Sequence, residues 1–187
     1  PVAYFLNGEY KGLMGLRERT DEDYIESNYG YEEDEIEYLR VMKDVGKYVA
    51  QIGTDEAYYK MEQYAASNNA DADFYNKLSQ MMDIDEYIDY QIIEQYIGNT
   101  DWVTNNTKLW RKHNGGRFRW ILFDTDFGLS PRSSALDTCM LDFTTKPIKT
   151  KSTSALALMQ SCMKNEDFRW KFLDQYLDRI ENQFTDE

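Results

Sequence analysis

Four polar side chains in the middle of the chain have the types and the spacing of a divalent-cation site. Asp101 and Asn106 belong to one polar segment, and Asp124 and Asp126 follow the next apolar run. Carboxylate and amide oxygens are the ligands that hard cations prefer. Mg²⁺ is commonly held by one or two carboxylates together with substrate phosphates and water. These residues therefore indicate a site for Mg²⁺, or a cation like it, shared with a phosphate-bearing substrate.

A β-hairpin is expected to bring these side chains together. Residues 107–111 and 118–123 have the composition of strands, and Asn114-Gly115 lies in the turn between them. Asn-Gly is a strong hairpin signal, because a type I′ turn needs positive φ at both central residues. Since a hairpin brings its two ends together, the polar side chains on either side of it should converge at one edge.

An apolar helix is predicted directly before the polar segment. Asp83 stands at the N-cap, Glu86 at the capping-box position, and Gly98 at the stop. The apolar positions recur every four residues and predict a buried stripe: Ile84, Ile88, Ile92 and Tyr96, with Tyr87 beside them. A closing helix capped by Asn165 is predicted from a second such stripe: Phe168, Phe172, Tyr176, Ile180 and Phe184.

The order of these parts matches the outline of a protein-kinase catalytic segment. An apolar helix is followed by D-x-x-x-x-N, a two-stranded hairpin and an Asp before Phe-Gly. In kinases the first Asp orients the acceptor hydroxyl or takes its proton, while the Asn and the second Asp hold metal on the nucleotide phosphates. The residues alone leave a simpler alternative open, in which Asp101 and Asn105 cap turns and Asp124 and Asp126 solvate a loop.

Longer strings resemble the CotH kinase family, the spore coat protein H type, over most of the chain. They are YFLNGEYKGLMGLRER, IDEYIDYQIIEQYIGNTDWVTNNTKLWR and RFRWILFDTDFG, and FRWKFLDQYLDRIENQF is similar to the family's closing helix. The resemblance implies an α+β, atypical protein-kinase-like fold. The chain would supply mainly the helical C-lobe, with an N-terminal β-hairpin around Asn7-Gly8 and the catalytic-loop β-hairpin.

The resemblance also implies an activity and roles for the four polar residues. The activity is transfer of phosphate from ATP to serine hydroxyls of a protein substrate, with Mg²⁺ or Mn²⁺. Asp101 matches the catalytic-loop Asp, and Asn106 matches the Asn that holds metal. The family pattern is D-x-D with its first member directly after a strand, which favours Asp124 as the second metal ligand and Asp126 as an auxiliary one.

The N-terminal part of the chain holds a candidate nucleotide-binding residue. Glu18 follows the first predicted hairpin, where a kinase chain would reach the nucleotide hinge; an ion pair with Arg17 or Arg19 is the alternative. The family carries its phosphate-binding lysine and covering loop upstream of the LNGEY hairpin. Residues 1–187 are therefore expected to be a single CotH-like kinase domain fragment of a larger protein.

The charge of the chain narrows the class of partner. Lys and Arg total 21 against 34 Asp and Glu, a net charge of −13. That balance argues against nucleic-acid binding, which depends on cations that neutralise phosphates. It favours a basic protein substrate, because complementary fields speed encounter, and the family resemblance implies that this substrate is serine-rich. No apolar run is long enough for a transmembrane segment, and an extracellular or cell-envelope location is suggested by the family resemblance only.

Two other classes of function stay open. A non-catalytic pseudokinase or cell-surface binding module could use the same scaffold, and the 15 tyrosines suit protein recognition. A carbohydrate-active domain would use Trp102, Trp110 and Trp120 with the carboxylates. His113 is the single histidine, which excludes a classical zinc site. Cys139 and Cys162 could pair, or both could be buried apolar groups.

Overall fold

The computed structural model describes residues 1–129, 139–145 and 153–184. The chain forms two compact units, Pro1–Glu33 and Asp34–Glu187, and each is described by itself. Helices and antiparallel strands alternate in blocks along the chain. The α+β class predicted from the sequence is therefore confirmed.

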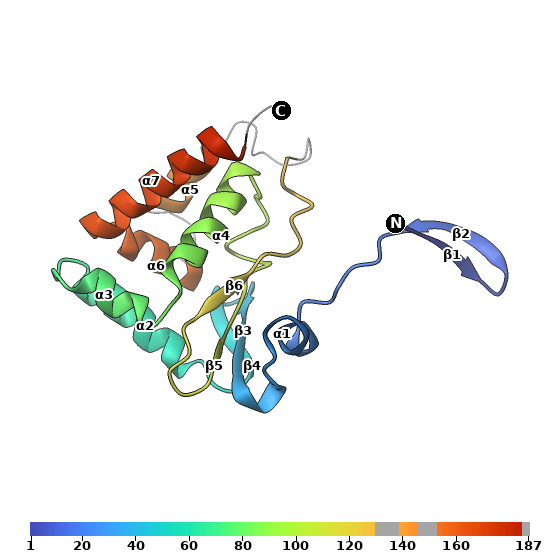
Figure 1. Cartoon of the computed structure of the whole chain (residues 1–187), viewed down its shortest axis with the longest axis horizontal. Coiled ribbons are helices and arrows are strands. Elements are labelled where there is room, and N and C mark those ends of the chain that lie inside the picture. Colours follow the sequence, from blue (N-terminus) through green and yellow to red (C-terminus); the bar gives the residue numbers. More distant parts are fainter. Residues whose placement is uncertain (130–138, 146–152, 185–187) are drawn as a thin grey trace. The chain divides into compact units, whose positions relative to one another are not determined.

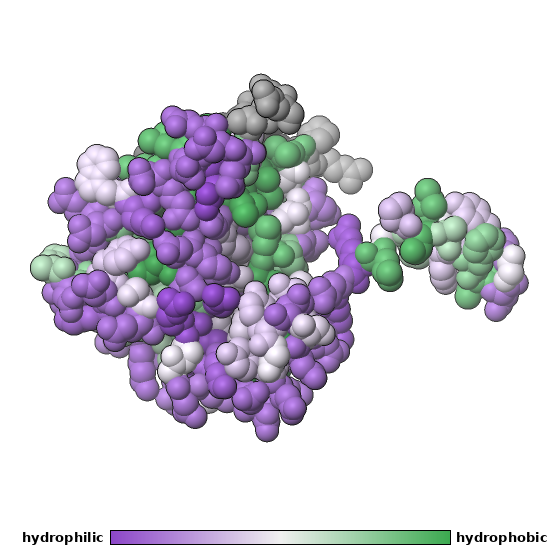
Figure 2. Space-filling view, in the orientation of Figure 1, coloured by the Kyte–Doolittle hydropathy of each residue, from purple (hydrophilic) through white to green (hydrophobic). Residues whose placement is uncertain are grey.

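The N-terminal unit begins with the predicted hairpin. Strands β1 (Val2–Leu6) and β2 (Glu9–Met14) pair antiparallel (Figure 1). Between them φ is 52° at Asn7 and 81° at Gly8, as a type I′ turn requires. Apolar side chains of both strands are exposed, and hydrophobic atoms are visible along this hairpin in Figure 2. Helix α1 (Glu22–Tyr29) follows and ends at Gly30.

The larger unit is built on a four-stranded antiparallel sheet in the order β4-β3-β5-β6. Its strands are β3 (Ile36–Met42), β4 (Lys47–Ile52), β5 (Lys108–Lys112) and β6 (Arg119–Ile121). The predicted hairpin is present as β5 and β6, although β6 is shorter than the predicted strand. The pairing of β5 with β3 is not predicted from the sequence, because strand pairing between distant segments has no local signal.

Helices cover this sheet and enclose the core (Figure 1). A 3₁₀ turn (Glu33–Glu35) precedes β3. The helices are α2 (Glu56–Asn68), α3 (Phe74–Ser79), α4 (Ile84–Tyr96), α5 (Met140–Thr145), α6 (Ser154–Cys162) and α7 (Glu166–Asn182). Helix α4 packs against β6 and α7, and α6 packs against α2 and β4. In the described part of the chain, no helix is long and apolar enough to cross a membrane.

The predicted apolar stripes are correct in their first turns and wrong at their C-terminal ends. On α4 the three isoleucines of the stripe are buried, while Tyr96 is 42% exposed. On α7 the Asn165 side chain caps the helix by accepting from the Phe168 N–H at 3.0 Å, as predicted. However, Ile180 is 41% exposed. Instead of entering the core, Tyr96 stacks on Phe184 with ring centroids 3.9 Å apart.

The acidic residues at the start of α4 bind the hairpin rather than cap the helix. The Asp83 carboxylate makes no side-chain cap; it accepts hydrogen bonds from Arg117 at 3.1 Å and Arg119 at 2.8 Å. Both oxygens of Glu86 lie 3.1 Å from the backbone N of Trp120. The predicted capping box is therefore wrong, because partners from the hairpin replace the local ones. These bonds fix β6 on α4.

Candidate functional site

The candidate site begins where α4 ends. Gly98 adopts φ 64°, its N–H donates to the Gln95 carbonyl at 3.2 Å, and the Asn99 N–H donates to the Glu94 carbonyl at 3.1 Å. These are the two bonds of a Schellman motif, which needs a left-handed residue that glycine adopts without strain. Gly98 is thus the predicted stop, and it directs the chain into the polar loop of residues 99–107.

Asp101 is held from three sides in this loop. Its Oδ2 accepts hydrogen bonds from the side-chain amides of Asn105 and Asn106, both at 3.1 Å. Its backbone N–H donates to Asn99 Oδ1 at 3.2 Å. The Lys43 ammonium, from the turn between β3 and β4, lies 3.9 Å from its Oδ1. Because the Asp101 side chain stays 29% exposed, a substrate can reach an already oriented carboxylate.

The residue after Asp101 anchors the loop in the core. Trp102 is buried, and its indole Nε1–H donates to the Tyr90 hydroxyl of α4 at 2.9 Å. The backbone then passes through left-handed conformations, with φ 76° at Val103 and 50° at Asn106. A β-branched residue with positive φ is an outlier, and such strain is retained where surrounding contacts enforce it, frequently at functional sites.

The hairpin places Asn106 and Asp124 at the same end. The last paired residues of β5 and β6 are Lys108 and Ile121. Asn106 precedes this pair, and Asp124 follows it with φ 54°. His113 lies in the turn at the opposite end, so it does not belong to this edge. The convergence predicted for the segments that flank the hairpin is thus present in the strand register.

The segment that contains Asp124 and Asp126 also returns to the end of α4. The Leu129 N–H donates to the Ile97 carbonyl at 2.6 Å, and a Cβ on Gly128 would lie 2.8 Å from the Ile97 side chain. The last turn of α4 is therefore a common point of two segments. The loop Asn99–Asn106 starts there, and the segment Asp124–Leu129 ends beside it. The glycine of the DFG sequence allows this close approach.

The two aspartates of this segment differ from Asp101 in their environment. Both side chains are exposed, and no hydrogen bond or ion pair joins either carboxylate to another described residue. The structure thus brings Asp101 and Asn106 into direct contact. It places Asp124 and Asp126 on the adjoining segment without such a contact.

The side-chain oxygens of Asn106, Asp124 and Asp126 suit a hard cation whose remaining ligands come from other molecules. The Asn106 side chain turns its amide nitrogen toward Asp101, so its carbonyl oxygen is the end available to a cation. Asp124 and Asp126 add two carboxylates that are not paired with any other described residue. Among the described residues no group of three or more His, Cys, Asp or Glu is arranged to hold a metal. Two carboxylates and an amide need substrate phosphates and water to complete the coordination, as is usual for Mg²⁺.

Several residues considered from the sequence lie in other surroundings. Glu18 belongs to the N-terminal unit and accepts a hydrogen bond from Asn28 at 3.2 Å, whereas Arg19 pairs with Asp21; its nucleotide-binding role stays a prediction. The tryptophans considered for stacking on sugars are all buried: Trp102, Trp110 and Trp120. Both cysteines are free, with Cys139 exposed and Cys162 buried.

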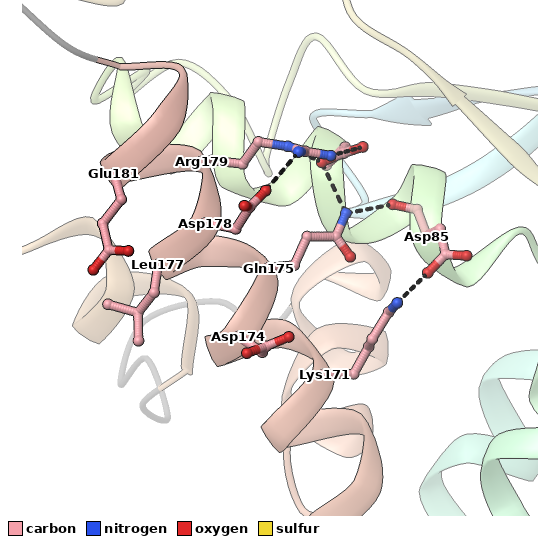
Figure 3. Close-up of a pocket in the computed structure, with 9 residues that line it drawn as sticks. Asp85, Lys171, Asp174, Gln175, Leu177, Asp178, Arg179 and Glu181 are labelled. Carbon is pink, nitrogen blue, oxygen red and sulfur yellow. Dashed lines mark hydrogen bonds and ion pairs between the residues drawn. The ribbon is translucent and has the colours of Figure 1, made fainter.

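A separate acidic groove lies between α4 and α7 (Figure 3). It has a volume of about 610 Å³, and none of the predicted site residues lines it. Two of its carboxylates are paired across the two helices: Asp85 with Lys171 at 3.0 Å, and Asp89 with Arg179 at 2.8 Å. Burial raises the pKa of Asp89, but the hydrogen bonds from Arg179 and Gln175 outweigh it, and the net pKa lies below its ordinary value. These ion pairs stabilise the contact between α4 and α7.

The sequence model of the family described as CotH kinase protein matches residues 1–187, the whole chain. The chain therefore belongs to the CotH kinase family. A comparison with curated protein sequences gives no match.

The sequence did not indicate Lys43 and Glu94, because a lysine in a turn and a glutamate in an apolar helix carry no motif of their own.

Proposed function

We propose that this chain carries the phosphoryl-transfer site of an atypical protein kinase that phosphorylates serine in a protein substrate, with ATP and Mg²⁺ or Mn²⁺. The observation that carries the proposal is the arrangement of Asp101. Its carboxylate is oriented by Asn105 and Asn106 and is partly exposed, and its loop starts at the end of α4, to which the segment that contains Asp124 returns. Membership of the CotH kinase family supports the same reading.

In this proposal Asp101 acts on the acceptor hydroxyl. Its carboxylate accepts the hydrogen bond of the serine O–H and takes the proton as the serine oxygen attacks the γ-phosphorus of ATP. The bond from the γ-phosphorus to the β,γ-bridging oxygen breaks, and ADP leaves with that oxygen. Asn105 and Asn106 hold the carboxylate in place, so little reorganisation is needed when the substrate arrives.

Asn106, Asp124 and Asp126 would hold the cation. When bound, Mg²⁺ or Mn²⁺ neutralises the charge on the ATP phosphates. Lys43 adds a cation near Asp101. Its ammonium stabilises the Asp101 carboxylate and offers a contact to a phosphate oxygen.

The net charge of −13 favours a basic acceptor, since like-charged proteins repel one another. A second candidate function rests on the N-terminal hairpin, which exposes Phe5, Leu6, Tyr10 and Leu13. Exposed apolar side chains of this kind mark protein-binding surfaces. A pseudokinase or surface-binding module would use them without chemistry at Asp101.

The test is phosphate incorporation measured by intact mass. The full-length protein is incubated with ATP, Mg²⁺ or Mn²⁺ and a basic, serine-rich peptide, in parallel with Asp124→Asn. Asp167→Asn serves as the matched control, because Asp167 is an exposed carboxylate on α7. We expect phosphate on the peptide that is lost with Asp124→Asn and retained with the control. No incorporation together with no metal-dependent ATP binding would favour the binding module.

A further inference from the structure

We infer that Glu94, a buried glutamate on the last turn of α4, is a positioning residue for Asp101 that acts through the side chain of Asn99. The inference rests on the proposed role of Asp101, but its geometric part can be tested without any catalysis. No motif points to Glu94; the structure connects it to the loop through Asn99, five residues further along the chain.

The first link joins Glu94 to Asn99. Both residues are fully buried, and Asn99 Nδ2 donates to Glu94 Oε2 at 2.8 Å. The backbone of Asn99 is bound to the same residue, since its N–H donates to the Glu94 carbonyl in the Schellman motif. Asn99 is therefore fixed by Glu94 through both its main chain and its side chain.

The second link joins Asn99 to Asp101. The other end of the Asn99 amide, Oδ1, accepts the Asp101 backbone N–H at 3.2 Å. An amide has one donor end and one acceptor end. Rotating it by half a turn would set Oδ1 against the Glu94 carboxylate and the NH₂ group against the Asp101 N–H. Both contacts would be repulsive for the ionised carboxylate of Glu94, which therefore selects the orientation that Asp101 needs.

The position of Glu94 is costly for the fold, which argues against a purely structural role. Its carboxylate lies at the C-terminal end of a helix, where the helix dipole disfavours negative charge. Burial raises the pKa of the Glu94 carboxyl to about 7, and the hydrogen bond from Asn99 opposes this rise. Its Oε1 is buried without a hydrogen-bond partner among the described residues. Groups that are costly to bury are retained where function needs them.

Glu94 is one of two anchors that α4 provides. Tyr90 lies one helical turn earlier, on the same face, and accepts the Trp102 indole N–H. Tyr90 thus fixes the residue after Asp101, while Glu94 fixes the residues before it. The two anchors together hold the backbone of Asp101 from both sides.

The first experiment measures the Asp101 amide by NMR, as its chemical shift and its hydrogen-exchange rate. We expect Glu94→Met, which removes the acceptor, to shift the resonance and to raise the exchange rate about tenfold or more, because the bond to Asn99 Oδ1 is no longer enforced. Glu94→Gln keeps an acceptor oxygen and should stay near the wild type. Glu86→Gln, at a partly buried carboxyl on the same helix, is the matched control and should leave this amide unchanged.

The second experiment measures phosphate transfer in a double-mutant cycle. We expect Glu94→Met to lower kcat about 10- to 100-fold with little change in KM, and Glu94→Gln to retain most of the activity. In an Asn99→Ala background, Glu94→Met should have almost no further effect, because it acts through Asn99. The inference is wrong if the effects of the two substitutions on kcat multiply. It is also wrong if the loss of activity only matches the fraction of unfolded protein.

These outcomes separate the inference from the proposed function. If the wild type transfers no phosphate but the Asp101 amide responds to Glu94→Met, the kinase proposal fails and the positioning role stands. If the amide does not respond, the positioning role fails whether or not phosphate is transferred. Should Glu94→Met not fold, Asn99→Ala tests the same link, and an unchanged Asp101 amide in that variant would contradict the inference.

Discussion

The two acidic segments of the candidate site differ in how their carboxylates are held. Asp101 accepts hydrogen bonds from two side-chain amides, and its loop is bound to α4 through Asn99 and Trp102. Asp124 and Asp126 are exposed and have no hydrogen bond or ion pair with another described residue. One segment is organised in advance, and the other presents unpaired charge.

The chemistry proposed for each segment explains why its carboxylates are held differently. A group that takes a proton must be oriented before the substrate arrives, because misplacement of about 1 Å can cost about 100-fold in rate. Carboxylates that hold a cation have another requirement. A carboxylate already paired with Lys or Arg would have to give up that partner before it could bind Mg²⁺.

The groove between α4 and α7 sharpens the comparison. It is also acidic, but Asp85 is paired with Lys171, and Asp89 is paired with Arg179 (Figure 3). Charge alone therefore does not mark the candidate site. The candidate site differs from the groove in that neutral amides of its own loop orient Asp101, whereas cations of the facing helix hold Asp85 and Asp89.

The largest effect is expected from Asp101→Asn. The amide keeps the shape and one acceptor oxygen but cannot take the serine proton, so phosphate transfer should fall by about 1,000-fold or more. Binding of metal and nucleotide should stay within about twofold, which isothermal titration would measure. Transfer at the wild-type rate would show that Asp101 is not the base.

Asp124→Asn should have a smaller effect, which changes the metal dependence of phosphate transfer. Loss of one charged ligand should raise the Mg²⁺ concentration needed for half-maximal transfer about tenfold or more. The same change at Asp126 should have a weaker effect, because Asp126 is the auxiliary ligand. A metal titration of transfer rates compares the two variants, and equal metal dependence in both variants and the wild type would place the cation elsewhere.

Tyr90→Phe should loosen the organised segment alone. It leaves the Trp102 indole N–H buried without its acceptor, which should lower the free energy of unfolding by about 1–3 kcal/mol. Tyr87→Phe is the matched control, because the Tyr87 hydroxyl is buried with no hydrogen-bond partner among the described residues. Urea unfolding of both variants measures this difference, and equal stability would mean that the Trp102 bond contributes nothing.

A further effect, on stability rather than on transfer, concerns Glu86, which binds the strand that leads to Asp124. Burial raises the pKa of Glu86 to about 8, against the opposing hydrogen bond from Trp120. The folded protein therefore holds a proton that the unfolded chain releases at about pH 4.5, the ordinary value. This contribution to stability is complete below pH 4.5 and is lost as the pH rises toward 8.

Glu86→Gln should remove that contribution and flatten the fall in stability between pH 5 and 8. The Gln side chain keeps an acceptor for the Trp120 N–H. Urea unfolding at a series of pH values measures the slope in the variant and the wild type. A variant whose stability falls as steeply as that of the wild type would show that Glu86 does not hold the proton.

The sequence predicted those elements whose signals are local. Asn7-Gly8 and Asn114-Gly115 form turns, Gly98 ends α4, and Asn165 caps α7. Their conformations depend on a few neighbouring residues, so they can be read without the fold. The contact of Asp101 with Asn106 also belongs to one short loop.

Tertiary structure alone decided which partners the long-range groups take. Asp83 and Glu86 had local cap positions to fill, but they bind arginines and a backbone amide of the hairpin. Lys43 reaches Asp101 only because β3 pairs with β5. The physical reason is the same in each case. A side chain has a few local partners, which its neighbours in the sequence reveal, and many distant ones, which become available only when the sheet and the helices assemble.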